Sequence, residues 1–170
     1  MPFPKTLARR GFLSCLLGIV SRPLPALPPP NGLFPLCTNM DSCVSSQHDA
    51  PKVFDEPWDY SDDNSSGSPQ LKLESQIKAM GGQIIELEPG FIRASFSLSK
   101  LVGQPTYDLV EFFFTPNDVT VQFRAERIGS GKDFGENKKR LEKMRLQLGW
   151  QKIPILRNRR RALLVIESPL

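Results

Sequence analysis

The sequence contains few of the side chains that metal sites and membrane spans require. One histidine and three cysteines among 170 residues leave little material for a His-rich metal site, so we expect no metal ion and no other cofactor. The longest apolar run, residues 12–20, is interrupted by Ser14. This run is too short to span a bilayer, which takes about 20 residues.

An excess of charge of one sign is also missing from most of the chain. The net charge of +4 comes from 22 basic and 18 acidic side chains, but Lys5, Arg9, Arg10 and Arg22 all lie in the first 26 positions. The other 144 residues carry 18 groups of each sign. Because general nucleic-acid binding depends largely on neutralising phosphates, this balance argues against a nucleic-acid partner.

Residues 1–26 have the three-part layout of a cleavable export signal. A basic region with Arg9 and Arg10 comes first, residues 11–20 form a short apolar region, and residues 21–26 form a polar region that ends on a small residue. The arginine pair precedes Gly, Phe and Leu, as in the twin-arginine signal. We therefore expect export to the thylakoid lumen of a chloroplast or cyanobacterium, with a bacterial periplasm as the alternative.

Residues 27–67 are rich in Pro, Ser, Asp and Asn, and we interpret them as an extended lead-in that ends in a polar linker at 59–67. Cys37 and Cys43 lie six positions apart in this segment. In an exported chain such a pair can close a small disulfide loop, and we expect this bond. Two free thiols or half of a metal site are the alternatives, and zinc is disfavoured because there is no second cysteine pair.

Residues 68–170 are expected to form a single α+β domain. Apolar residues recur with helical spacing in two segments and alternate along strand-like segments that are joined by short turns. This order favours an antiparallel sheet of about four to five strands with two helices packed on it. The expected helices are 69–80 and 135–149, and the expected strands are 84–88, 91–99, 108–115, 119–125 and 162–167.

Two segments carry the motifs of one family. In residues 37–46 a cysteine is followed, after a short spacer, by Cys-Val-Ser-Ser. In the second segment the matching residues are Asp108, Val110, Glu111 and Phe112, then Arg127-Ile128-Gly129, Asp133-Phe134-Gly135 and residues 137–142. These motifs resemble the uncharacterised family catalogued as domain of unknown function 1499, and the resemblance covers most of residues 37–150. The family has no established reaction, so the resemblance implies kinship and no particular chemistry.

Asn137 is the polar member of an otherwise apolar helical stripe. Asn137, Leu141, Met144 and Leu148 are spaced four, three and four residues apart, so Asn137 is expected to face inward. A buried amide needs hydrogen-bond partners. We interpret Asn137 as a tie to the backbone of the loop 127–135, with a ligand-holding amide at the base of a pocket as the alternative.

Six polar residues are candidates for a binding site. We expect Asp133 to accept hydrogen bonds at the start of the second helix. We expect Arg127 and Arg140 to pair with Glu111 and Asp108, which would cross-link helix and hairpin. No catalytic or metal-ligand spacing stands out among them, so no catalytic residue is assigned. The full set is Asp108, Glu111, Arg127, Asp133, Asn137 and Arg140.

The two parts of the chain after the export signal differ in charge. Residues 27–126 carry 6 basic and 14 acidic side chains, whereas residues 127–170 carry 12 basic and 4 acidic ones. A basic C-terminal face suggests an acidic protein surface or an anionic membrane face as partner, although a solvated hairpin turn would explain its densest part equally well. That basic patch consists of Arg157, Arg159, Arg160 and Arg161.

Three functions are compatible with these features. The favoured one is a small exported binding or assembly factor, auxiliary to photosynthetic membrane complexes if the source is photosynthetic. The second is a hydrolase-like enzyme that uses the carboxylate, arginine and asparagine cluster. The third is a carrier of a hydrophobic ligand that uses Phe112, Phe113 and Phe114.

Overall fold

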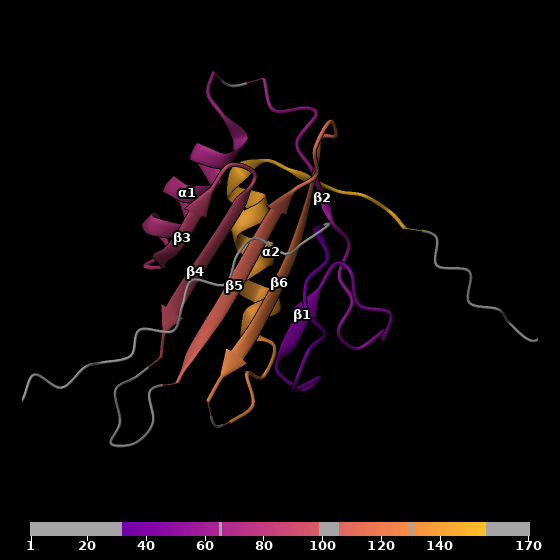
Figure 1. The fold of residues 1–170 in the computed structure, drawn as a ribbon, viewed down its shortest axis with the longest axis vertical. Helices are drawn as coiled ribbons and strands as arrows, with labels where there is room; N and C mark the ends of the chain where they lie inside the picture. The colour runs from indigo at the N-terminus through magenta and orange to yellow at the C-terminus, as the bar shows by residue number, and fades with distance from the viewer. Residues whose placement is uncertain (1–31, 65, 99–105, 130, 156–170) are drawn as a thin grey trace, which may run out of the picture.

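The structure is a computed structural model, and it describes residues 32–64, 66–98, 106–129 and 131–155. These residues form an antiparallel sheet with two helices packed on one face (Figure 1). The strands follow the order β3-β4-β5-β6-β2-β7, and β1 pairs with a further part of β6. In chain order the elements are β1 (Cys43–Ser45), β2 (Trp58–Asp59), α1 (Pro69–Ala79), β3 (Gln83–Glu88), β4 (Phe91–Ser97), β5 (Tyr107–Phe114), β6 (Thr120–Ile128), α2 (Glu136–Leu148) and β7 (Gln151–Lys152).

The α+β class, the antiparallel sheet and the two helices are confirmed, but the expected count of about four to five strands is too low. The sheet has seven strands in the described residues, because β1, β2 and β7 add short pairings of two or three residues each. β1 and β2 come from the segment interpreted as a lead-in. The export signal at 1–26 and the expected strand at 162–167 lie outside the described residues.

The hydrophobic core lies between the helices and one face of the sheet. Every second residue of β4, β5 and β6 points to this face, as the alternation predicts. α1 covers the face with Leu73 and Ile77, and α2 covers it with Leu141 and Met144. The strand residues of this core are Ile92, Ala94, Phe96, Val110, Phe112, Phe114, Val121, Phe123 and Ala125.

The short strand β2 supplies one of the largest buried side chains. The ring of Trp58 is fully buried, and its centroid lies 5.6 Å from that of Phe112 and 4.9 Å from that of Phe123. Trp150, just after α2, packs 6.2 Å from Trp58. Trp58, from the segment interpreted as a lead-in, therefore belongs to the core, and the expected polar linker begins inside β2.

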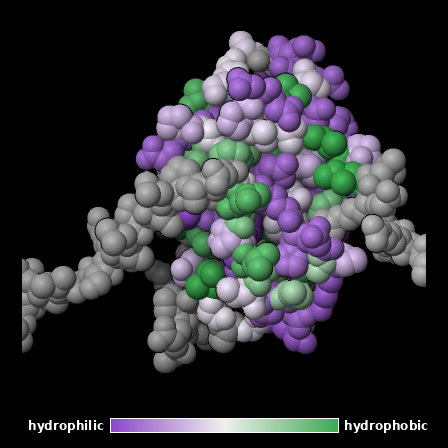
Figure 2. Space-filling model, turned by 45° about the vertical axis from the view of Figure 1, so that its right-hand side comes forward, coloured by the Kyte–Doolittle hydropathy of each residue, from purple (hydrophilic) through white to green (hydrophobic). Residues whose placement is uncertain are grey.

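α1 begins at Ser68 and Pro69 as expected, although the Ser68 side chain makes no capping hydrogen bond. The helix ends at Ala79, and Gly81 follows with a φ of +83°, which suits glycine. Among the described residues, no helix is long and apolar enough to cross a membrane. On the face shown in Figure 2, apolar residues form small groups separated by hydrophilic ones.

Candidate functional site

The six candidate residues fall into two groups on opposite faces of the sheet. Asp108 lies on the helix side of β5, whereas Glu111, an odd number of positions later, lies on the helix-free side. Arg127, Asp133, Asn137 and Arg140 gather with Asp108. The structure therefore does not bring all six residues into one site.

Asp108 is the centre of the first group. It is fully buried, and its two carboxylate oxygens accept hydrogen bonds from Arg127 Nε and Arg140 Nη2, each at 2.8 Å. Arg127 is its cross-strand partner in β6, and Arg140 comes from α2, so the carboxylate joins helix and sheet. The side-chain hydrogen bond that Arg127 donates to Asp108 raises the pKa of Arg127. The expected link between helix and hairpin is present, but the expectation that Glu111 shares it is wrong.

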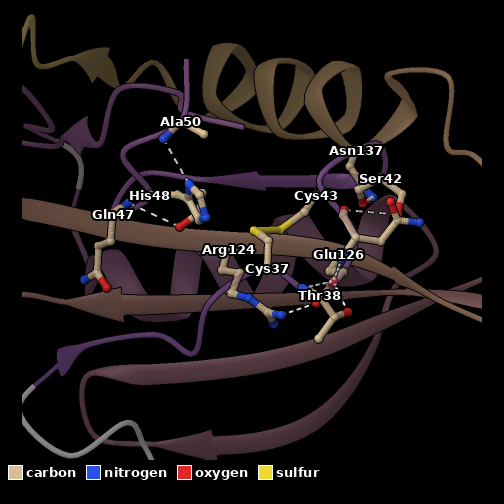
Figure 3. The surroundings of a disulfide bond; sticks show 12 residues. Cys37, Thr38, Ser42, Cys43, Gln47, His48, Ala50, Arg124, Glu126 and Asn137 are labelled. Carbon is tan, nitrogen blue, oxygen red and sulfur yellow. Dashed lines mark hydrogen bonds and ion pairs between the residues drawn. A yellow bond between two sulfur atoms is a disulfide. The ribbon is translucent and has the colours of Figure 1, made fainter. Parts of the chain in front are cut away.

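Asn137 is fully buried on the inward face of α2, as its stripe predicts. Its Nδ2 donates to the backbone oxygen of Ser42 at 3.2 Å, and its Oδ1 accepts from Arg140 Nη1 at 2.7 Å. The backbone partner that we expected in the loop 127–135 thus lies in the disulfide loop instead (Figure 3). Asn137 holds that loop against the start of the helix.

The expected disulfide joins Cys37 to Cys43, whose Cα atoms are 6.0 Å apart. The loop that it closes is attached to the end of β6, because Arg127 N donates to Ser42 O at 3.1 Å. Lys132 Nζ, in the loop between β6 and α2, lies 4.0 Å from Oδ2 of Asp41, which belongs to the disulfide loop. The disulfide loop and the loop between β6 and α2 therefore lie side by side where β6 ends (Figure 1).

Asp133 anchors the second of these loops. Its Oδ1 accepts from Gly135 N at 3.0 Å, and its Oδ2 accepts from Asn137 N at 3.1 Å. It is therefore the expected acceptor at the start of α2. Between Asp133 and Gly135, the chain holds Phe134 in the left-handed region with φ +51°, and its side chain is 82% exposed.

We call residues 36–42 and 131–135 the loop end. Besides Phe134, this region exposes Leu36 at 77% and Met40 at 51%. Sequence reasoning missed all three, since the only apolar residues that it weighed as site candidates were Phe112, Phe113 and Phe114. The available signal was an apolar residue set between Asp133 and a glycine in a short glycine-rich loop.

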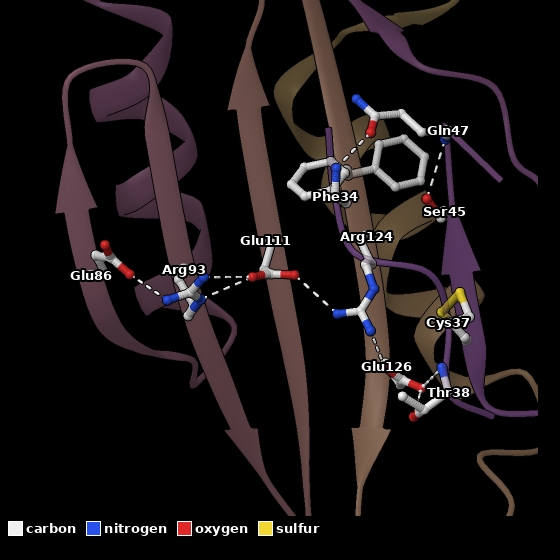
Figure 4. A network of polar contacts seen from close by, with 12 residues as sticks. Phe34, Cys37, Thr38, Ser45, Gln47, Glu86, Arg93, Glu111, Arg124 and Glu126 are labelled. Carbon is white, nitrogen blue, oxygen red and sulfur yellow. Dashed lines mark hydrogen bonds and ion pairs between the residues drawn. A yellow bond between two sulfur atoms is a disulfide. The ribbon is translucent and has the colours of Figure 1, made fainter. Parts of the chain in front are cut away.

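Glu111 belongs to a row of charges on the helix-free face (Figure 4). Its Oε1 accepts from Arg93 Nε at 2.9 Å and Arg93 Nη2 at 2.8 Å, and its Oε2 accepts from Arg124 Nη1 at 3.0 Å. Arg93 also bonds Glu86, and Arg124 also bonds Glu126. Glu86, Arg93, Glu111 and Arg124 are direct cross-strand neighbours from β3 to β6.

Glu126 ends the row and holds the first residues of the disulfide loop. Its side chain is nearly fully buried, and its Oε1 accepts from Thr38 N at 2.7 Å, from Asn39 N at 2.9 Å and from the Thr38 hydroxyl. Gln47 holds the same stretch further back, since its side chain bonds the backbone of Phe34 and Gly32. The row is thus occupied with bonds inside the protein, except for Arg124 Nε, which has no partner among the described residues.

In the described part of the chain, no three His, Cys, Asp or Glu side chains come together in a way that could hold a metal ion. Phe112 and Phe114 belong to the packed core, and Phe113 lies on the opposite face. Two surface hollows, of about 650 and 400 Å³, lie along α1, and neither is lined by these phenylalanines or by the six polar candidates. The basic patch at Arg157, Arg159, Arg160 and Arg161 lies outside the described residues.

Comparison with known proteins gives one match. A family model described as "Protein of unknown function (DUF1499)" matches residues 34–148. No curated protein is similar enough to match the chain. The matched range includes the loop end, the Asp108 group and the charged row.

Proposed function

The chain belongs to the DUF1499 family, and from this premise we propose that it is a small exported binding protein that docks to an anionic partner through its loop end. The polar groups support binding over catalysis. Asp108, Arg127, Arg140 and Asn137 bond one another and the backbone, so their hydrogen-bonding capacity serves the joint between helix, sheet and disulfide loop.

The observation that carries the proposal is Phe134. Burying a phenylalanine side chain contributes about 1.5–3 kcal/mol, yet this ring is 82% exposed. A left-handed conformation costs a residue with a side chain about 1–2 kcal/mol, yet the loop is held in it by two hydrogen bonds that Gly135 N and Asn137 N donate to Asp133. A chain that holds an apolar ring outward at such a cost is not optimised there for stability alone, which favours a role in contact with a partner.

Phe134→Asn separates this role from stability. Asparagine tolerates the left-handed region better than phenylalanine does, so we expect an unchanged or higher melting temperature. We expect the same variant to lose most of its binding to membranes isolated from the native source, measured by co-sedimentation of the tagged full chain. Leu146→Asn is the matched control, because Leu146 is 61% exposed in the last turn of α2, away from the loop end.

A structural role for Phe134 predicts the opposite pattern. In that case Phe134→Asn would lower the melting temperature, and membrane binding would fall only as far as folding does. Equal binding by wild type, Phe134→Asn and Leu146→Asn would remove the loop end from consideration.

The export part of the proposal rests on the arginine pair and the three-part pattern of residues 1–26. Replacing both Arg9 and Arg10 by lysine keeps the charge but removes the pair that the twin-arginine route requires. We expect the unprocessed chain to accumulate on the side of synthesis, seen by immunoblotting of fractionated cells or organelles. Normal processing of the double variant would contradict this route.

A further inference from the structure

We propose that the loop end binds the surface of an anionic lipid bilayer, with the Phe134 ring placed in the headgroup region. This inference rests on the proposed function and names what the loop end contacts. The bilayer inference is supported by the apolar residues that the loop end exposes, by their arrangement and by the lysines around them.

The apolar residues come from two loops that are separately fixed. Leu36 comes just before the disulfide loop, and Met40 lies within it. Asn137 and Arg127 hold this loop by donating hydrogen bonds to Ser42 O. Phe134 is held by the Asp133 bonds. Each of the three residues is more than half exposed, so most of its surface is available to a partner.

Lysines surround these apolar residues. Lys52 and Lys132 are each 68% exposed at the side chain, Lys139 is 71% exposed, and Lys138 is exposed next to it at the start of α2. Asp41 and Glu136 are each paired with a lysine, and the third carboxylate of this region, Asp133, is buried and accepts from two backbone amides. Four lysines against three carboxylates leave a positive surplus, and each lysine near an anionic membrane surface strengthens partitioning by about fivefold.

A bilayer surface fits this arrangement better than an acidic protein does. Protein interfaces concentrate their binding energy in closely packed clusters that fill a complementary surface. The headgroup region is fluid and accepts separate apolar side chains without a matched pocket, while anionic headgroups attract the lysines. Separate apolar side chains with lysines around them are therefore the pattern expected at an anionic bilayer.

Protein-free vesicles test the inference. The full chain is sedimented with vesicles of phosphatidylglycerol mixed with phosphatidylcholine, and with phosphatidylcholine alone, so that residues outside the described range contribute equally to every variant. We expect Phe134→Asn to weaken partitioning by about tenfold, as removal of one buried apolar side chain implies. We expect the double variant Lys132→Glu, Lys138→Glu to lose the preference for the anionic vesicles, and Leu146→Asn to match wild type.

Tryptophan fluorescence locates the ring directly. The two native tryptophans, Trp58 and Trp150, are at most 1% exposed, so Phe134→Trp adds a single indole that can respond to lipid. We expect its emission to shift to shorter wavelength with anionic vesicles and not with phosphatidylcholine alone. An unshifted emission, or equal sedimentation of wild type and Phe134→Asn, overturns the bilayer inference.

The two proposals fail in different ways. If Phe134→Asn loses binding to native membranes while no variant differs with vesicles, the loop end remains the docking surface and the partner is a protein. If Phe134→Asn changes neither, the bilayer inference and the proposed function both fall.

Discussion

Asp108→Asn is expected to lower the free energy of unfolding by about 3 kcal/mol, at the lower end of the range for breaking a buried ion pair. The substitution keeps the side-chain shape but leaves the guanidinium groups of Arg127 and Arg140 without their carboxylate. Their side chains are 10% and 16% exposed, so water compensates only in part. Urea denaturation of both proteins measures the difference.

The same substitution is expected to loosen the loop end. Asp108 orients Arg140, and Arg140 in turn donates to Oδ1 of the Asn137 side chain. The Nδ2 of the same side chain donates to Ser42 O. Hydrogen exchange should therefore accelerate at the amides of Gly135 and Asn137. Lys78→Gln is the control, since it breaks an exposed pair with Glu74 that is worth about 0.5 kcal/mol or less. Similar losses for both variants would mean that the Asp108 group is no more than a surface ion pair.

Glu126→Gln is expected to cost about 3 kcal/mol as well, and to release the chain around Thr38. The carboxylate accepts from two backbone amides and a hydroxyl, and it pairs with Arg124. A glutamine has one acceptor oxygen, so its NH₂ group must face either these donors or the Arg124 guanidinium, which also donates. The expected results are a lower urea midpoint and faster proteolytic cleavage at residues 32–39.

Glu88→Gln serves as the matched control, because it makes the same chemical change at an exposed position of β3. Its midpoint and cleavage pattern should match those of wild type. If Glu126→Gln also behaves like wild type, then Gln47 and the disulfide suffice to hold this segment, and the carboxylate is dispensable.

The main strands and helices could be predicted because each is long enough to show a period. The alternation along β4, β5 and β6 and the stripe of α2 gave the correct buried faces. β1, β2 and β7 have two or three residues each, too few for any pattern. β1 and β2 become strands because β6 is long and offers backbone partners along its other edge, and β7 pairs with β2, which local sequence does not encode.

The candidate site was predicted in part. The pairing of Arg127 and Arg140 with Asp108 could be predicted from the residue types. Grouping Glu111 with them was wrong, because successive side chains of a strand alternate between its faces, which puts positions 108 and 111 of β5 on opposite sides of the sheet. The Glu111 partners Arg93 and Arg124 could have been found with the same rule. The outward Phe134 ring leaves no periodic trace, because a left-handed residue follows no helix or strand period, so its setting between Asp133 and a glycine was the signal available in the sequence.

The charged row has a consequence for how the sheet selects its alignment. A slip of β5 by two residues against β4 would keep apolar side chains on the helix side, so core packing alone would discriminate poorly against it. The slip would place Leu109 or Phe113 opposite Arg93, so that Arg93 would lose Glu111 and keep only Glu86. Charges that alternate in sign across the facing positions from β3 to β6 therefore penalise such a slip, even where the net contribution of these ion pairs to stability is small.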